Sequence, residues 1–143
     1  MPPPALSHKS VEHRFAVCTR GIAYSWGRGQ YGVLGHDDKE KDHPIPARIR
    51  GLNAKIVVAR VACGRWHCIA LSGVSGLYCW GRNQMGQLGL GYTSRACAAP
   101  TAVELEPGGQ CPALIRDIAA GTFTQVESRI NRIWWVLSRS FQS

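Results

Sequence analysis

Several hallmarks of common protein classes are missing from this 143-residue sequence. No run of apolar residues approaches the roughly 18 needed to cross a membrane as a helix. The amino terminus, MPPPALSHKS, has prolines where a secretory signal would need an apolar helix, so we expect an intracellular protein of the cytoplasm or nucleus. Residues 1–12 are predicted to be a disordered leader.

Acidic residues are scarce, with 9 Asp and Glu against 17 Lys and Arg and a formal net charge of +8. Such an excess permits attraction to nucleic acid, anionic lipid or an acidic protein. The basic residues are nevertheless scattered from Lys9 to Arg139, and clustering is what marks a nucleic-acid footprint. Binding of chromatin or DNA is therefore the less favoured interpretation.

A second set of metal ligands is also missing. Cys63, His67 and Cys68 are close together in the sequence, but no further ligand pair with the spacing of a zinc site follows them. Cys18 and Cys79 lie, like Cys63 and Cys68, in apolar segments, which favours buried, reduced thiols over a disulfide scaffold. The sequence predicts no metal and no cofactor.

No catalytic constellation is present. Residues 27–32, GRGQYG, read as G-x-G-x-x-G, but their counterpart at 81–86 has Asn83 at the middle glycine and neither stretch leads into a helix, so a nucleotide cradle is not expected. Cys68 and His67 are neighbours on a predicted strand and point to opposite faces. We predict that the protein is not an enzyme.

What the sequence does contain is a repeat. YSWGRGQYGVLG at residues 24–35 returns at 78–89, displaced by 54 residues, with eight identities over twelve positions. The alignment extends from His13 and His67 to Pro46 and Pro100, and residues 61–64 return at 118–121. A period slightly above 50 lies in the range of propeller blades.

Each repeat reads as a β-hairpin followed by a glycine loop. Residues 27–35 carry four glycines, too many for a helix interior, so some backbone positions need positive φ. No crossover helix fits between the strands, which predicts an all-β blade. The expected strands are 15–19, 22–26, 47–52, 56–63, 68–72 and 77–80, with an exposed charged loop at 36–43.

The repeated residues have expected structural roles. Each sheet must bury an apolar face against the next blade, and Trp26 and Trp80 are expected to pack between blades. His13 and His67 recur at the repeat period, which favours a structural role over chemistry. The residues of this repeat signature are His13, Trp26, Gly27, Gly32, Leu34, Gly35, Gly64, His67, Trp80, Gly81, Gly86, Leu88, Gly89 and Gly121.

From about His13 to Gly121 the chain resembles the regulator of chromosome condensation repeat. That resemblance rests on WGRNQMGQLGLG, a proline-marked strand and VACGRWHCIAL, and it implies the blades of a seven-bladed β-propeller. Members of the family include exchange factors for Ran-type small GTPases, substrate-binding parts of ubiquitin ligases and the plant ultraviolet-B photoreceptor. Fold alone therefore does not fix the function.

The chain departs from the family pattern in its extent. Only about two blades are present, Thr124 stands where a third histidine would fall, and the pattern stops there. We therefore expect a partial β-propeller over residues 13–125, truncated relative to the family, with self-association as the alternative. The out-of-family tail, 126–143, is expected to form a short amphipathic helix or a strand.

The favoured function is a protein-interaction module that binds through its exposed loops, chiefly 36–43 and 92–99. The alternative that the resemblance implies is guanine-nucleotide exchange on a Ran-like small GTPase, which needs no general base. The photoreceptor carries tryptophan and arginine in reverse order beside the corresponding histidine, so a similar role would require Trp66 to lie exposed among charges. The candidate partner-binding residues are Arg28, Asp37, Asp38, Arg65, Trp66 and Arg82.

Overall fold

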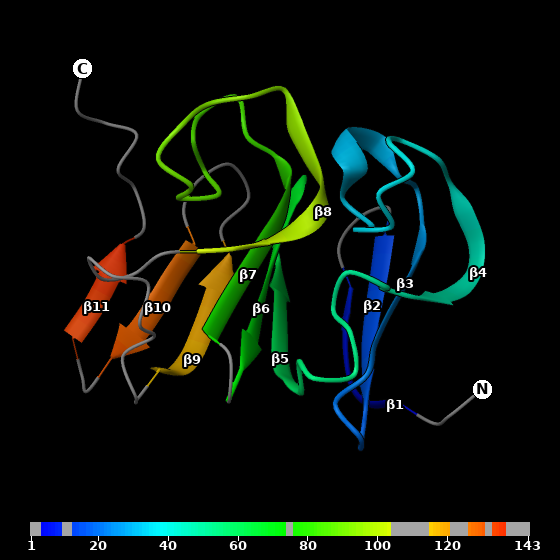
Figure 1. Cartoon of the computed structure of the whole chain (residues 1–143), viewed down its shortest axis with the longest axis horizontal. Helices are drawn as coiled ribbons and strands as arrows, with labels where there is room; N and C mark the ends of the chain where they lie inside the picture. Colours follow the sequence, from blue (N-terminus) through cyan, green and yellow to red (C-terminus); the bar gives the residue numbers. More distant parts are fainter. Residues whose placement is uncertain are drawn as a thin grey trace.

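A computed structural model describes residues 4–9, 13–73, 76–103, 115–120, 126–130 and 133–136, with side chains for 13–73 and 76–103, Ile118 and Ala120. The described chain forms three antiparallel sheets, which follow one another side by side (Figure 1). The first holds β1 (Pro4–Lys9), β2 (His13–Cys18), β3 (Ala23–Gly27) and β4 (His43–Arg48). The second holds β5 (Val58–Cys63), β6 (His67–Ser72), β7 (Gly76–Arg82) and β8 (Ala96–Ala102). The third holds β9 (Ile115–Ala120), β10 (Val126–Ile130) and β11 (Ile133–Val136).

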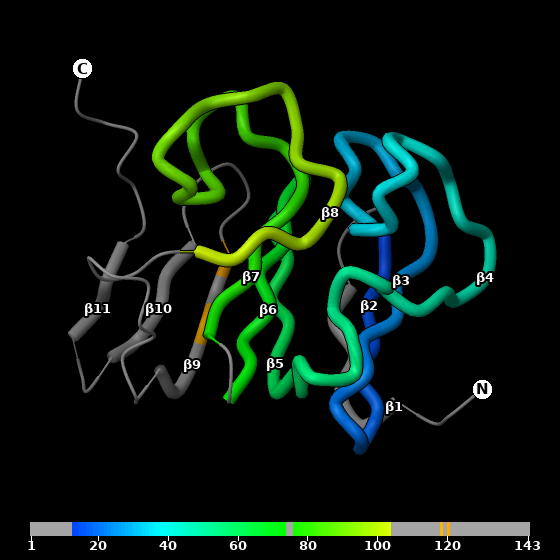
Figure 2. Tube along the Cα trace, viewed as in Figure 1, coloured from blue at the N-terminus to red at the C-terminus, as the bar shows by residue number. Residues whose placement is uncertain are grey.

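Figure 2 follows the chain from the first four-stranded sheet into the second. Between β3 and β4 lies one short 3-10 turn, η1 (Gln30–Gly32). Within the described ranges no helix is both long and apolar enough to cross a membrane. The all-β expectation is confirmed.

The first two sheets repeat each other in register as well as in sequence. His13 pairs with Gly27 in the first sheet, and His67 pairs with Gly81 in the second. Each sheet is an antiparallel meander in which every strand pairs with the next along the chain. Residues that are 54 positions apart in the sequence therefore occupy equivalent positions in two successive sheets.

Strand β1 corrects the expectation of a disordered leader over residues 1–12. Residues 4–9 pair antiparallel with β2, and they lie 54 residues before the limits of β5. Pairing satisfies the backbone groups that would otherwise line the edge of β2. Pro4 stands at the first position of the strand, where a missing N–H does least harm.

One further strand prediction needs correction. Strand β4 begins at His43 and ends at Arg48, whereas the sequence predicted a strand over 47–52. Pro44 and Pro46 are accommodated because β4 is the edge of its sheet. In the tail, β10 and β11 form an antiparallel pair, so residues 126–130 and 133–136 follow the strand alternative and not the helix alternative.

The apolar core lies between the sheets. Phe15 and Val17 on the first sheet face Cys68, Ala70 and Trp80 on the second. The opposite face of the second sheet, with Ile69, Leu71, Leu77 and Cys79, packs against Ile118 of β9. Each sheet thus buries its apolar face only because a neighbouring sheet covers it.

The two repeated tryptophans have different surroundings. Trp80 is fully buried between the first and second sheets. Trp26 is half-buried, because it lies on the face of β3 opposite to the one that packs against the second sheet. The prediction of inter-blade packing therefore describes Trp80 and does not describe Trp26 within the described part of the chain.

Candidate protein-interaction surface

The glycine loops bring the two repeats together at one end of the sheets. Gly32 and Gly35 have φ of +67° and +74°, and a Cβ added to them would lie 2.6 Å from the Cα of Ala98 and 2.9 Å from Nε1 of Trp80. Glycine is therefore required both for the backbone conformation and for the close approach of the second repeat. Gly86 and Gly89 repeat these conformations with φ of +69° and +67°.

Five side chains from both repeats meet at this end. Tyr31 belongs to the loop after β3, and Arg65 and Trp66 belong to the turn before β6. Arg82 is the last residue of β7, and Arg95 directly precedes β8. The loops after β3 and β7 lie at the same end of their sheets, at the top of Figure 1. We call Tyr31, Arg65, Trp66, Arg82 and Arg95 the arginine–aromatic cluster.

Tyr31 is the centre of this cluster. The guanidinium carbons of Arg82 and Arg95 each lie 5.1 Å from the centroid of its ring. The ring of Trp66 meets it edge to face at 5.5 Å, and Arg65 lies 5.2 Å from the Trp66 ring. Such cation–π contacts orient guanidinium groups without neutralising them.

One carboxylate already belongs to the surface. Arg95 donates to both carboxylate oxygens of Glu40, at 2.7 and 3.2 Å, and the backbone N–H of Tyr31 donates to Glu40 at 2.9 Å. Arg82 donates from Nε to the side-chain oxygen of Gln84 at 2.7 Å. Arg65 and Arg82 form no ion pair with a carboxylate of the described chain.

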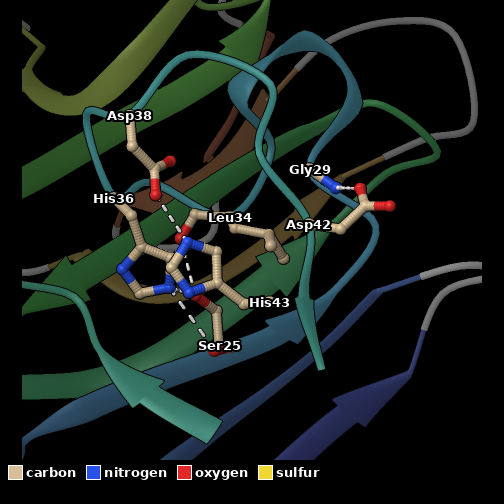
Figure 3. Close-up of polar contacts among 7 residues, drawn as sticks. All are labelled: Ser25, Gly29, Leu34, His36, Asp38, Asp42 and His43. Atoms are coloured by element: carbon tan, nitrogen blue, oxygen red, sulfur yellow. Dashed lines mark hydrogen bonds and ion pairs between the residues drawn. The ribbon is translucent and has the colours of Figure 1, made fainter. Parts of the chain in front are cut away.

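Hydrogen bonds hold the charged loop 36–43 in place next to the cluster. The backbone N–H of Gly29 donates to Asp42 at 2.8 Å, and Nε2 of His43 contacts the Asp38 carboxylate at 2.6 Å (Figure 3). Part of the acidic character of this loop is thus used to hold the glycine loop. The candidate residue Asp38 contacts His43 within the charged loop itself.

A serine and a histidine also meet below this loop. The hydroxyl of Ser25 donates to the carbonyl oxygen of Leu34 at 2.6 Å, and its oxygen lies 2.8 Å from Nε2 of His36. The His36 ring lies 4.2 Å from that of His43, and burial, with the nearby His43, lowers the pKa of His36. Since the Ser25 proton is committed to a carbonyl, this group is not arranged as an activated nucleophile.

Of the remaining candidate residues, Arg28 lies on the first glycine loop and Asp37 on the charged loop. Arg28 is exposed on the first glycine loop, and Asp37 has a φ of +57° with its N–H donating to Ala98 at 3.1 Å. The N–H of Gly64 donates to the carbonyl of His67 at 2.8 Å and closes the turn that carries Arg65. Gly121 and Thr124 lie outside the described residues.

His13 and His67 are both only 1% exposed. Neither ring nitrogen of His67 has a hydrogen-bond partner in the described part of the chain, and burial lowers its pKa to about 4. His67 is therefore neutral at physiological pH.

Four of the cysteines are buried in the same way. Cys18, Cys63, Cys68 and Cys79 are buried free thiols, and burial raises the pKa values of Cys68 and Cys79. A thiol with a raised pKa is a poor nucleophile and a poor metal ligand. Among the described residues no group of three or more His, Cys, Asp or Glu side chains could hold a metal ion.

Sequence reasoning selected Arg65, Trp66 and Arg82 but missed Tyr31, Glu40 and Arg95. Tyr31 aligns with Met85 in the second repeat, and a large side chain at the tip of both glycine loops was the available signal. Glu40 and Arg95 are 55 residues apart, and no local pattern links them.

Stacked antiparallel sheets, of which the first two have a glycine loop between their third and fourth strands, are typical of the β-propeller class of repeat proteins. The profile of the Regulator of chromosome condensation (RCC1) repeat matches residues 20–71 and 75–125. The chain belongs to this family, and the described part is a partial β-propeller.

The chain is similar to several curated relatives. It is 37% identical to human Protein RCC2 over 98 residues, which cover 68% of this chain and 18% of that protein. It is 42% identical to the Ultraviolet-B receptor UVR8 of Arabidopsis thaliana over 84 residues, which cover 58% of this chain and 19% of the receptor. The chain thus spans about a fifth of the length of these relatives.

Solved structures show the same fold. Human WBSCR16 superposes with a TM-score of 0.77 at 23% identity, covering 91% of this chain and 31% of that one. Prp20p of Saccharomyces cerevisiae, described for its binding to Gsp1p and histones, superposes with a TM-score of 0.75 at 22% identity, covering 96% of this chain and 34% of Prp20p.

Proposed function

We propose that this chain is a non-enzymatic, intracellular protein-interaction module whose binding surface is the loop end of the first two sheets. The observation that carries the proposal is the arginine–aromatic cluster, because it joins residues of both repeats into one exposed surface. Arginine and aromatic side chains are enriched where proteins bind proteins.

Two features support this assignment. The cluster combines guanidinium groups of fixed direction with aromatic rings that lose little conformational entropy on binding. The buried Ser25, His67 and cysteines described above offer no activated group for covalent chemistry. These residues therefore support binding to another protein better than they support catalysis.

Chemical cross-linking tests the location of this surface. The full chain is used to capture partners from a cell extract, and captured complexes are treated with a lysine-reactive cross-linker. Lys39 and Lys41 lie in the charged loop beside the cluster, whereas Lys55 lies before β5 at the opposite end of the sheets. We expect intermolecular cross-links at Lys39 and Lys41 and few at Lys55. Cross-links confined to Lys55, or no specific partner at all, would remove the proposal.

Exchange activity on a small GTPase is the second candidate. It is supported by the family resemblance and by the description of Prp20p as a protein that binds Gsp1p. Release of labelled nucleotide from a panel of small GTPases tests it. Acceleration by the full chain, lost in Tyr31→Ala, would make exchange the function of the same surface.

A further inference from the structure

The arginine–aromatic cluster carries positive charge that the described chain does not neutralise. Glu40 pairs with Arg95, and both groups remain accessible, with side-chain exposures of 40% and 60%. Arg65 is exposed and Arg82 is half-buried, and neither has a carboxylate partner in the described residues. Two oriented guanidinium groups are therefore available to an external anion.

The pairing of Arg95 with Glu40 shows what kind of anion fits. Both carboxylate oxygens accept from the guanidinium group while that group stays over the Tyr31 ring. Arg82 has the same distance to the same ring, and Gln84 occupies only its Nε. Its terminal N–H groups can donate to both oxygens of a second carboxylate in the planar, two-bonded geometry that arginine favours.

The charged loop 36–43 limits the length of this anion. Glu40 of this loop is in direct contact with Tyr31 and Arg95 of the cluster, and Asp42 accepts a hydrogen bond from Gly29 on the glycine loop that carries Tyr31. A nucleic-acid backbone that crosses the cluster would pass these carboxylates, and like charges at short range are repulsive. Arg65 and Arg82 belong to the second sheet, whereas the charged loop follows β3 of the first, so a short acidic segment that pairs with these two arginines does not need to cross the loop.

We propose that the arginine–aromatic cluster binds an acidic segment of a partner protein, whose carboxylates pair with Arg65 and Arg82 beside the rings of Trp66 and Tyr31. This inference rests on the proposed function and names the class of its partner. The aromatic rings hold the guanidinium groups in place, so a bound carboxylate must have the right orientation as well as the right charge.

Fluorescence anisotropy with the full chain tests the inference. The probes are a labelled glutamate-rich peptide, its glutamine counterpart and a labelled single-stranded DNA oligonucleotide. The test variant is Arg65→Gln/Arg82→Gln. The matched control is Arg20→Gln/Arg50→Gln, which removes the same charge from exposed positions at the opposite end of the sheets.

We expect the test variant to weaken binding of the glutamate peptide about 10-fold or more, since each lost charge-assisted hydrogen bond costs on the order of a factor of 10. The control should change it by less than about 2-fold, because long-range attraction is screened. Arg82→Lys, which keeps the charge and loses the planar group, should fall between wild type and the test variant. The glutamine peptide should not bind.

Three outcomes overturn the inference. If the test and control variants weaken peptide binding equally, the binding depends on net charge and not on the cluster. Tighter binding of DNA than of peptide, with the same dependence on Arg65 and Arg82, would assign the cluster to nucleic acid. Cross-links to a partner at Lys39 and Lys41 that persist in the test variant would refute the acidic segment and leave the interaction module intact. Arg65→Gln alone, at an exposed position, supplies the answer if the double variant does not fold.

Discussion

The indole N–H of Trp80 donates to the carbonyl oxygen of Val33 across the boundary between the two repeats, at 2.8 Å. Trp80 is fully buried, and its ring lies 6.1 Å from that of Phe15 on the facing sheet. A buried indole N–H needs an acceptor, and here a backbone carbonyl of the previous glycine loop supplies it. One side chain thus fixes both the spacing of the sheets and the position of the loop that carries Tyr31.

We predict that Trp80→Ala lowers the free energy of unfolding by about 3 to 5 kcal/mol, because it empties a core position and leaves the Val33 carbonyl with only the weak donor of the Cys68 thiol. Trp80→Phe retains most of the apolar contact and should cost about 1 to 3 kcal/mol. Chemical denaturation of the full chain measures both. Trp26→Ala is the control, since Trp26 is only half-buried, and a cost equal to that of Trp80→Ala would contradict the assigned packing.

Gly35→Ala and Gly91→Ala separate backbone strain from packing. Both glycines have positive φ, +74° and +85°, so each substitution should cost about 1 to 2 kcal/mol in backbone strain. At Gly35 the new methyl group also meets the buried indole of Trp80, whereas nothing lies within 4 Å at Gly91. Denaturation should show a clearly larger loss for Gly35→Ala. Equal losses would show that the loop does not need to approach Trp80 closely.

His67 should make stability depend on pH. Its folded pKa of about 4 lies below its ordinary value of 6.5, so the unfolded chain binds a proton that the folded chain rejects between these values. The contribution is present above pH 6.5 and is lost as the pH falls toward 4, amounting to about 3 kcal/mol at about 1.4 kcal/mol per pKa unit. Denaturation across this window, with His67→Gln as the non-titrating control, measures it. Identical pH dependence in the two proteins would contradict the buried, neutral state.

Glu40→Gln tests the occupancy of the arginine–aromatic cluster. Its ion pair with Arg95 is partly exposed, and such pairs contribute about 0 to 1 kcal/mol, so the melting temperature should hardly change. Removing the resident carboxylate frees Arg95 for an external one. Anisotropy with the glutamate peptide should therefore show tighter binding by about 3-fold or more, or about 0.7 kcal/mol. Weaker binding would mean that Glu40 positions the cluster instead of competing for it.

The fold could be predicted because the same pattern of residues occurs twice. Trp80, Gly81 and Gly86 each have a counterpart 54 residues earlier, and they mark the end of a strand and the loop that follows it. Strand β1 could not be found in this way, since PALSHK shares no residue pattern with VARVAC of β5 and forms a strand through pairing with β2. Tertiary pairing overrides weak local propensity in such segments.

The cluster could be predicted only in part. Arg65, Trp66 and Arg82 are neighbours of repeat-signature residues, and this proximity made them predictable as candidates. Tyr31, Glu40 and Arg95 became part of it through contacts between the repeats, which depend on how closely the sheets stack. That distance is set by Trp80 and the glycines together, and the sequence does not state it.

Hydrogen–deuterium exchange of the full chain, alone and with a captured partner, tests most directly whether both repeats build one binding surface. The account predicts that binding slows exchange in residues 29–32, 64–66 and 82–95 together, while the turns at 19–22 and 53–57 at the opposite end are unchanged. Protection confined to one repeat, or to those opposite turns, would contradict it.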